Sequence, residues 1–124
     1  MKKLLPLCVV LLVGCGRLST EECIEQLKSK DAAQRLHVVK ALGERVAEVP
    51  RTVPALALAL KDEDAFVRRD AARALGRIGE EARAAVPNLA AAARDRNGNV
   101  RRAAADALQK IDPTAVARAG GQRK

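Results

Sequence analysis

The sequence predicts an all-α fold, a short superhelix (solenoid) of about three helix pairs with a period of 33 residues. The period is visible when Val53-Pro54 is aligned with Val86-Pro87, because the two segments then match without a gap as far as Ile78 and Ile111. The composition agrees, since aromatic residues make up 1% of the chain and the apolar content is mostly Ala, Leu and Val. Small side chains let helices approach closely, so we expect a thin helical stack.

Residues 1–14 are predicted to be a signal peptide that is removed from the mature protein. Two lysines precede an apolar run that is shorter than the roughly 20 residues needed to span a bilayer. The run leads into Leu12-Val13-Gly14-Cys15, which resembles the lipobox of bacterial lipoproteins. The resemblance implies cleavage between Gly14 and Cys15, acylation of Cys15 and retention of the exported protein at the bacterial cell membrane. The alternatives are an ordinary signal peptide and an apolar segment of the fold.

Residues 15–19 would then form a lipidated tether that carries a mature chain of net charge +6, from 21 basic and 15 acidic side chains. Gly16 rather than Asp follows the acylated cysteine, which resembles the signal for the outer membrane in diderm bacteria. In such a host we expect the anchored protein to lie on the periplasmic face of the outer membrane. Cys23 is the one thiol left after processing, and the repeat alignment places it at a core position. Pairing of this thiol between two molecules is the alternative.

Residues 20–119 are predicted to form the repeat domain, with repeats at about 20–48, 53–79 and 86–112. Each repeat should contain two helices, the first opened by Pro54 or Pro87. Residues with side chains suited to N-capping stand at one repeat position before each second helix: Asp31, Asp64 and Asn97. The second helix of the middle repeat should bury one apolar stripe, and the third repeat has the equivalent set: Val67, Ala71, Ala74, Leu75 and Ile78; Val100, Ala104, Ala107, Leu108 and Ile111.

Further signals predict where these helices begin and end. Ser19 and Glu22 have the spacing of a capping box at the start of the first repeat. Gly79 should end the second helix of the middle repeat, and Asp112-Pro113 that of the third. A short helix over residues 114–119 is expected to cap the stack, and residues 120–124 are predicted to be a flexible basic tail.

The pattern resembles HEAT repeats, in particular the short repeats of bacterial relatives of phycobilin lyases. The resemblance rests on residues that recur 33 positions apart: Pro54, Leu56, Asp62, Val67, Arg68, Ala71, Ala72, Ala74, Leu75, Gly76 and Ile78. It implies a structural ladder of Asp and Arg side chains between repeats, formed here by Asp62, Arg68, Asp95, Arg101 and Arg35. The first repeat departs from the pattern, with Ser29 in place of the Asp, Gln34 in place of Val67 and Arg45 in place of Ile78.

No catalytic site, metal site or cofactor site is predicted. His37 is the only histidine and aligns with Asp70 and Ala103 on an expected outer surface, so no catalytic pair or triad can be assembled. After processing, one thiol and one imidazole remain, whereas a structural zinc site needs four ligands. We therefore expect a binding protein rather than an enzyme.

Basic residues form the one candidate binding feature. Arg69, Arg73 and Arg77 are spaced four apart, hence on one helix face, and Arg102 and Lys110 stand at equivalent positions in the third repeat. If the second helices line the concave side, these side chains face a groove in which they could bind carboxylate or phosphate. A solvated surface interrupted by Asp70, Glu80, Glu81 and Asp106 is the alternative.

The predicted function is a membrane-anchored scaffold for protein–protein interaction in the bacterial cell envelope, attached through the acyl anchor at Cys15. Binding of an anionic envelope polymer or a phosphate-bearing ligand through the Arg/Lys stripe is the alternative. Export argues against nucleic acid as the ligand.

Overall fold

The computed structural model describes residues 18–121, and this part of the chain is helical without strands. The first repeat contains α2 (Thr20–Gln26) and α3 (Ala32–Gly43). The second contains the 3-10 helix η1 (Val46–Glu48), α4 (Val49–Ala59) and α5 (Ala65–Ile78). The third contains the 3-10 helix η2 (Gly79–Ala85), α6 (Val86–Ala92) and α7 (Gly98–Ile111), and α8 (Pro113–Gly121) follows it.

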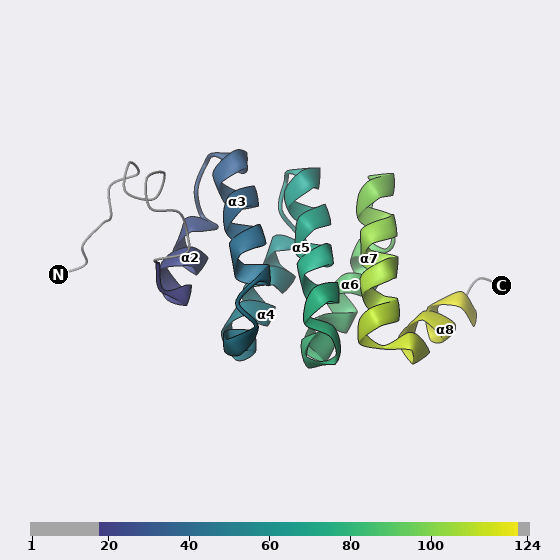
Figure 1. Cartoon of the computed structure of the whole chain (residues 1–124). Coiled ribbons are helices and arrows are strands. Elements are labelled where there is room, and N and C mark those ends of the chain that lie inside the picture. Colours follow the sequence, from purple (N-terminus) through teal and green to yellow (C-terminus); the bar gives the residue numbers. More distant parts are fainter. Residues whose placement is uncertain (1–17, 122–124) are drawn as a thin grey trace.

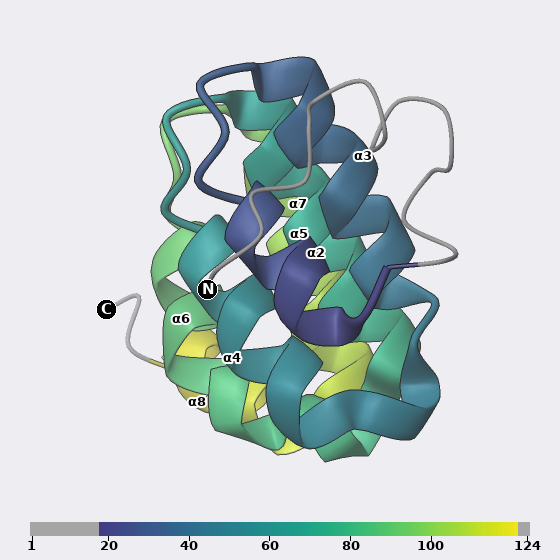
Figure 2. The same cartoon turned by 90° about the vertical axis from the view of Figure 1, so that its left-hand side faces the viewer.

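The helices form two layers. Figure 1 shows α3, α5 and α7 side by side in one row, with α4 and α6 behind them, α2 at one end and α8 at the other. The view turned by 90° separates the two layers (Figure 2). Successive helix pairs thus stack in one direction, which confirms the predicted all-α superhelix.

The predicted caps are present. The side chains of Asp31, Asp64 and Asn97 each accept hydrogen bonds from backbone amides in the first turn of α3, α5 or α7. Ser19 and Glu22 form both bonds of the capping box at the start of α2. Gly79 ends α5 with a φ of 78°, a conformation that a residue with a Cβ rarely adopts.

The first helix of the middle repeat begins earlier than its proline pattern predicts. Pro54 was expected at the start of this helix but lies inside α4, which begins at Val49 and has Pro50 in its first turn. Val49 and Thr52 are buried, so tertiary packing extends the helix by about one turn toward the N-terminus. Pro87 lies in the first turn of α6, as predicted.

The core consists of small and branched apolar side chains, and Cys23 is fully buried within it. The second helices of the repeats, α3, α5 and α7, form the inner row, and their close approach depends on glycine. A Cβ at Gly43 of α3 would lie 2.7 Å from the Cβ of Ala74 on α5. A Cβ at Gly76 of α5 would lie 3.1 Å from the Cα of Ala107 on α7. The repeated glycine therefore sets the spacing between neighbouring repeats.

The ends of the stack differ from its interior. At the first end, Arg45 donates from Nη2 to the carbonyl of Leu18 at 2.6 Å and from Nη1 to Thr20 Oγ1 at 3.2 Å. These bonds hold the start of α2 against the segment that follows α3. At the other end, the predicted capping helix is present as α8 and is longer than expected. Gly120 and Gly121 belong to α8 and not to a tail, and residues 122–124 lie outside the described part.

Candidate binding groove

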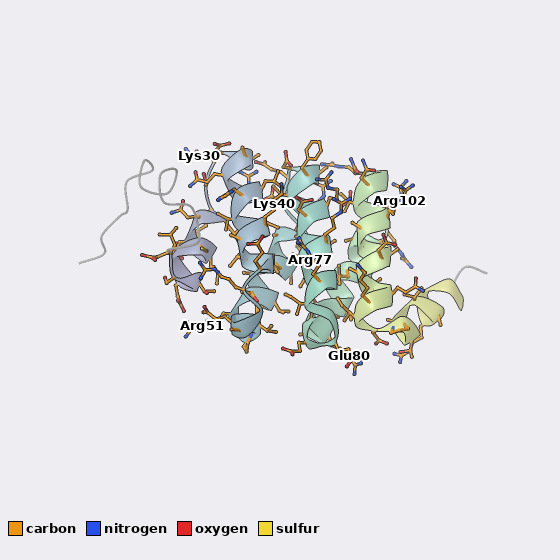
Figure 3. The ribbon with its side chains drawn as sticks, in the orientation of Figure 1. Lys30, Lys40, Arg51, Arg77, Glu80 and Arg102 are labelled. Atoms are coloured by element: carbon orange, nitrogen blue, oxygen red, sulfur yellow. The ribbon has the colours of Figure 1, made fainter. Side chains whose placement is uncertain are left out.

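A groove of about 560 Å³ runs between α5 and α7. Its lining includes all five basic residues of the predicted stripe: Arg69, Arg73 and Arg77 on α5, and Arg102 and Lys110 on α7. Asp106 is the one acidic residue in this lining. Figure 3 shows Arg77 and Arg102 on the same side of the inner row as Lys40 of α3. Tertiary structure thus places the two basic rows opposite each other.

Helical spacing and close packing together build this groove. Residues four apart lie on one face of a helix, so each helix presents one charged row. Gly76 and Ala107 lie in the groove lining, and their close contact brings α5 near α7. Long arginine and lysine side chains at either side therefore surround a floor of small residues.

A buried carboxylate, Asp70, fixes part of the basic surface. Its side chain is about 6% exposed and accepts a hydrogen bond from Arg69 Nε at 2.9 Å. Arg73 Nη1 and Lys40 Nζ lie 3.9 and 3.8 Å from its carboxylate oxygens. Asp70 is therefore a positioning residue for Arg69 and Arg73, and its expected place on the outer surface was wrong. Ala103, its equivalent on α7, is buried as well, whereas His37 is exposed as expected.

The remaining cations of the groove have no acidic partner. Among residues 18–121, no ion pair within 4.0 Å involves Arg77, Arg102 or Lys110. The guanidinium of Arg69 also lies 5.1 Å from the ring centre of Phe66, which is 58% exposed. The groove thus offers three cations without an ion pair within 4.0 Å, two arginines near Asp70 and a nearby exposed aromatic ring.

A smaller hollow of about 250 Å³ extends the charged surface toward α3. Arg69, Arg73 and Arg77 contribute to it, together with Lys40, Glu44 and Asp70. Glu80 and Glu81, which were expected to interrupt the stripe, line neither hollow. Glu80 lies beyond the lower end of α5 in Figure 3. Sequence reasoning missed Asp70 as an organiser, although Arg69 and Arg73 stand one and three residues from it.

The predicted ladder between repeats forms at two levels. Arg35 binds Asp62 and Arg68 binds Asp95, each through two nitrogens. Burial raises the pKa of Asp95, but hydrogen bonds from Arg68 and from the amide of Asn97 outweigh it and hold the pKa below its usual value. The hydrogen bond to Asp62 raises the pKa of Arg35. Arg101 departs from the prediction, because it pairs with no Asp within residues 18–121.

Other site types have no support within residues 18–121. These residues include no group of three His, Cys, Asp or Glu side chains that could bind a metal ion. None of their helices has the length and apolarity needed to cross a bilayer. Gly14 and Cys15, the predicted cleavage and acylation site, lie outside the described residues.

Comparisons with known proteins address the same fold. A family model for HEAT repeats matches residues 20–109. No curated protein sequence matched the chain. A chain in the complex of CpcE and CpcF of phycocyanin lyase from Nostoc sp. PCC7120 is similar, with 33% identity and a TM-score of 0.73 over 96% of this chain and 45% of that one. An engineered protein is 27% identical with a TM-score of 0.67, over 82% of this chain and 51% of its own.

The chain therefore spans about half the length of these two solved structures. The family match covers most of the chain and includes both well-formed repeats. The repeated helix pairs, the ladder of Arg and Asp and the family match agree, and the chain belongs to the HEAT-repeat family.

Proposed function

We propose that this protein is a membrane-anchored HEAT-repeat scaffold that binds an acidic segment of a partner protein in the groove between α5 and α7. The observation that carries the proposal is the set of cations without acidic partners, Arg77, Arg102 and Lys110, around a groove floor of small residues. Arginine binds carboxylates through two parallel hydrogen bonds, which gives such a groove orientation as well as charge. The proposal includes no catalysis and no cofactor.

The single acid in the groove favours a peptide over a uniform polyanion. Asp106 lies on α7 between Arg102 and Lys110, one helical turn from each. A polymer with a phosphate at every step would be repelled at this carboxylate, whereas a peptide can present a backbone N–H or a polar side chain there. The similar structure from Nostoc is a complex of two proteins, which also supports a protein partner.

The proposed anchor leaves this groove accessible. Cys15 precedes Leu18 by three residues, a reach of at most roughly 10 Å in extended chain. Leu18 adjoins α2, at one end of the row of helices, while α7 lies toward the other end (Figure 1). An acyl group on Cys15 would therefore hold the first repeat near the membrane, at the end of the row farther from α7.

Direct binding measurements test the groove. A labelled peptide of alternating glutamate and glycine is titrated into the protein, with inorganic polyphosphate as the competing class of ligand. We expect the triple variant Arg77→Gln/Arg102→Gln/Lys110→Gln to lose at least about tenfold in peptide affinity, since charge-assisted hydrogen bonds contribute about 1.5–3 kcal/mol each. The matched control removes three exposed arginines outside the groove: Arg83→Gln/Arg94→Gln/Arg96→Gln.

Equal losses in the two triple variants would contradict the proposal, because net charge alone would then explain binding. Groove-dependent binding of polyphosphate without binding of the peptide would support the alternative, an anionic envelope polymer as ligand. That binding should weaken steeply as salt is added.

Cys15→Ala tests the proposed anchor separately. The variant removes the thiol that receives the lipid, and each acyl CH₂ buried in a bilayer contributes about 0.8 kcal/mol. We expect an unprocessed chain that is no longer fractionated as an acylated membrane protein. Unchanged processing and fractionation would contradict acylation without affecting the groove. The outer membrane is the proposed location in a diderm host.

A bilin-binding role is the second candidate, because the similar Nostoc structure belongs to a phycocyanin lyase. Addition of a free bilin should then change its visible absorption spectrum in the presence of this protein. The groove lining includes cations but no thiol, so such a change would report noncovalent binding there. An unchanged spectrum would exclude this candidate.

A further inference from the structure

The Arg–Asp ladder has one geometry at both of its complete levels. Arg35 donates from Nε and Nη2 to the carboxylate of Asp62 at 2.9 and 3.1 Å, and Arg68 donates to Asp95 at the same two distances. In each case Nη1 donates 2.8 Å to a carbonyl in the turn of the arginine's own repeat. The turn therefore holds the guanidinium, and its remaining edge faces the next repeat.

Arg101 makes the hydrogen bonds to its own turn but does not pair with a carboxylate within residues 18–121. Its Nη1 donates to the carbonyls of Asp95 and Arg96 at 2.8 and 3.2 Å, as Arg68 does to Asp62 and Glu63. No carboxylate accepts from its Nε and Nη2 within residues 18–121. All 15 acidic side chains of the sequence lie in that range, so a side-chain carboxylate that completes this level must come from outside these 124 residues.

The first repeat cannot supply that carboxylate from a second copy of the chain. Ser29 stands where Asp62 and Asp95 do, and its Oγ accepts from the amide of Asp31 at 3.2 Å, which keeps the turn. Its hydroxyl donates to Gln34 Oε1 at 2.9 Å, and Gln34 donates to Gln26 at 2.5 Å. At this end an uncharged network therefore replaces the turn carboxylate of the later repeats.

We propose that Arg101 is the centre of a second docking surface, which binds a helix-pair repeat of another protein through an Asp in the turn between its helices. Ala105 lies one helical turn after Arg101 and is exposed, whereas its equivalents Val39 and Ala72, in repeats that another repeat follows, are fully buried. The partner's turn would cover Arg101 and Ala105. This surface is separate from the groove, so it does not depend on the function proposed above.

The docking contact is centred on the first half of α7. Gln109 stands where Gly43 and Gly76 allow close helix packing, and it is exposed. A helix of the partner therefore cannot pack along the second half of α7 as closely as α7 packs on α5. α8 also begins at that end of α7, so the N-terminal half is the accessible part.

A pair of complementary full-length chains tests the proposal. The donor carries Ser29→Asp/Arg101→Gln, which supplies the turn carboxylate and removes the donor's own guanidinium, so that it cannot polymerise. The acceptor is the wild-type chain, and sedimentation velocity of the mixture measures association. We expect a 1:1 complex that weakens at least about tenfold with an Arg101→Gln acceptor, the loss typical of a bidentate charged pair.

Two controls distinguish a specific ion pair with Arg101 from general charge attraction. A donor with Ser29→Asn/Arg101→Gln keeps the turn acceptor without the charge and should not associate. An acceptor with Arg96→Gln removes a neighbouring exposed arginine and should associate as the wild type does. If Ser29→Asp unfolds the donor by leaving Gln34 buried without its partner, adding Gln34→Val restores the residue of the later repeats. No association, or association that Arg101→Gln leaves unchanged, would overturn the proposal.

Discussion

Equivalent arginines inside and at the end of the stack allow the ladder to be tested with matched substitutions. Arg68→Met and Arg101→Met remove the same guanidinium from positions 33 residues apart and keep an apolar stem of similar length. The side chain of Arg68 is 7% exposed and its partner Asp95 is 12% exposed. Arg101 is exposed and donates only to backbone carbonyls of its own turn.

The expected magnitudes follow from these environments. Removing one partner of a buried ion pair leaves an uncompensated charge and costs about 3–5 kcal/mol. Arg101 loses hydrogen bonds that water replaces, so its cost should stay below about 1.5 kcal/mol. The free energy of unfolding should therefore differ between the two variants by about 2 kcal/mol or more, a large part of a typical domain's total stability.

Urea unfolding followed by far-ultraviolet circular dichroism measures this difference, provided that both variants keep the wild-type dependence on urea concentration. The double variant Arg68→Met/Asp95→Asn should lose less stability than the sum of its two single variants, because no charge is then left unpaired. Asn keeps the side-chain acceptor for the amide of Asn97. The reasoning would be refuted by equal losses of stability in Arg68→Met and Arg101→Met, together with additive effects of Arg68→Met and Asp95→Asn. The buried Arg68–Asp95 pair would then have no stabilising role.

Three further predictions concern the core. Gly43→Ala places a methyl group 2.7 Å from Ala74 Cβ, so it should destabilise the protein by about 1–2 kcal/mol even after the gain in helix propensity. Gly76→Ala, where the nearest atom is 3.1 Å away, should be nearly neutral. Equal urea midpoints of the two variants would contradict this prediction. The lowered pKa of Asp95 means that its contribution is complete above pH about 3.9 and is lost as pH falls toward its lower folded value, so Asp95→Asn should reduce the loss of stability on acidification. The buried thiol of Cys23 should react with a thiol reagent only upon unfolding, and rapid labelling of the native protein would contradict this.

Features that depend on short-range hydrogen bonds could be predicted from the sequence. Asp31, Asp64 and Asn97 bond to amides two or three residues away, so their residue types and spacing were sufficient. The 33-residue period and the Ala-rich composition determined the all-α stack, and the alignment placed Cys23 in the core. Helical spacing also put the three arginines of α5 on one face.

Features that depend on a neighbouring helix were decided by tertiary structure. His37 and Asp70 occupy one repeat position, yet Asp70 is buried with Lys40 of α3 beside it, while no inner helix precedes His37 within residues 18–121. Val49 and Thr52 pack into the core and extend α4 beyond the start that Pro54 indicates.

The lack of a carboxylate partner for Arg101 within residues 18–121 also depends on what lies beside the repeat. Arg68 and Arg101 are the same residue type in the same local turn, and each donates from Nη1 to carbonyls of that turn. Only stacking of the next repeat gives Arg68 its carboxylate and excludes water from it. The sequence by itself determined each repeat's internal bonds, and the tertiary structure decided which of its polar groups are compensated, because that depends on what lies beside the repeat.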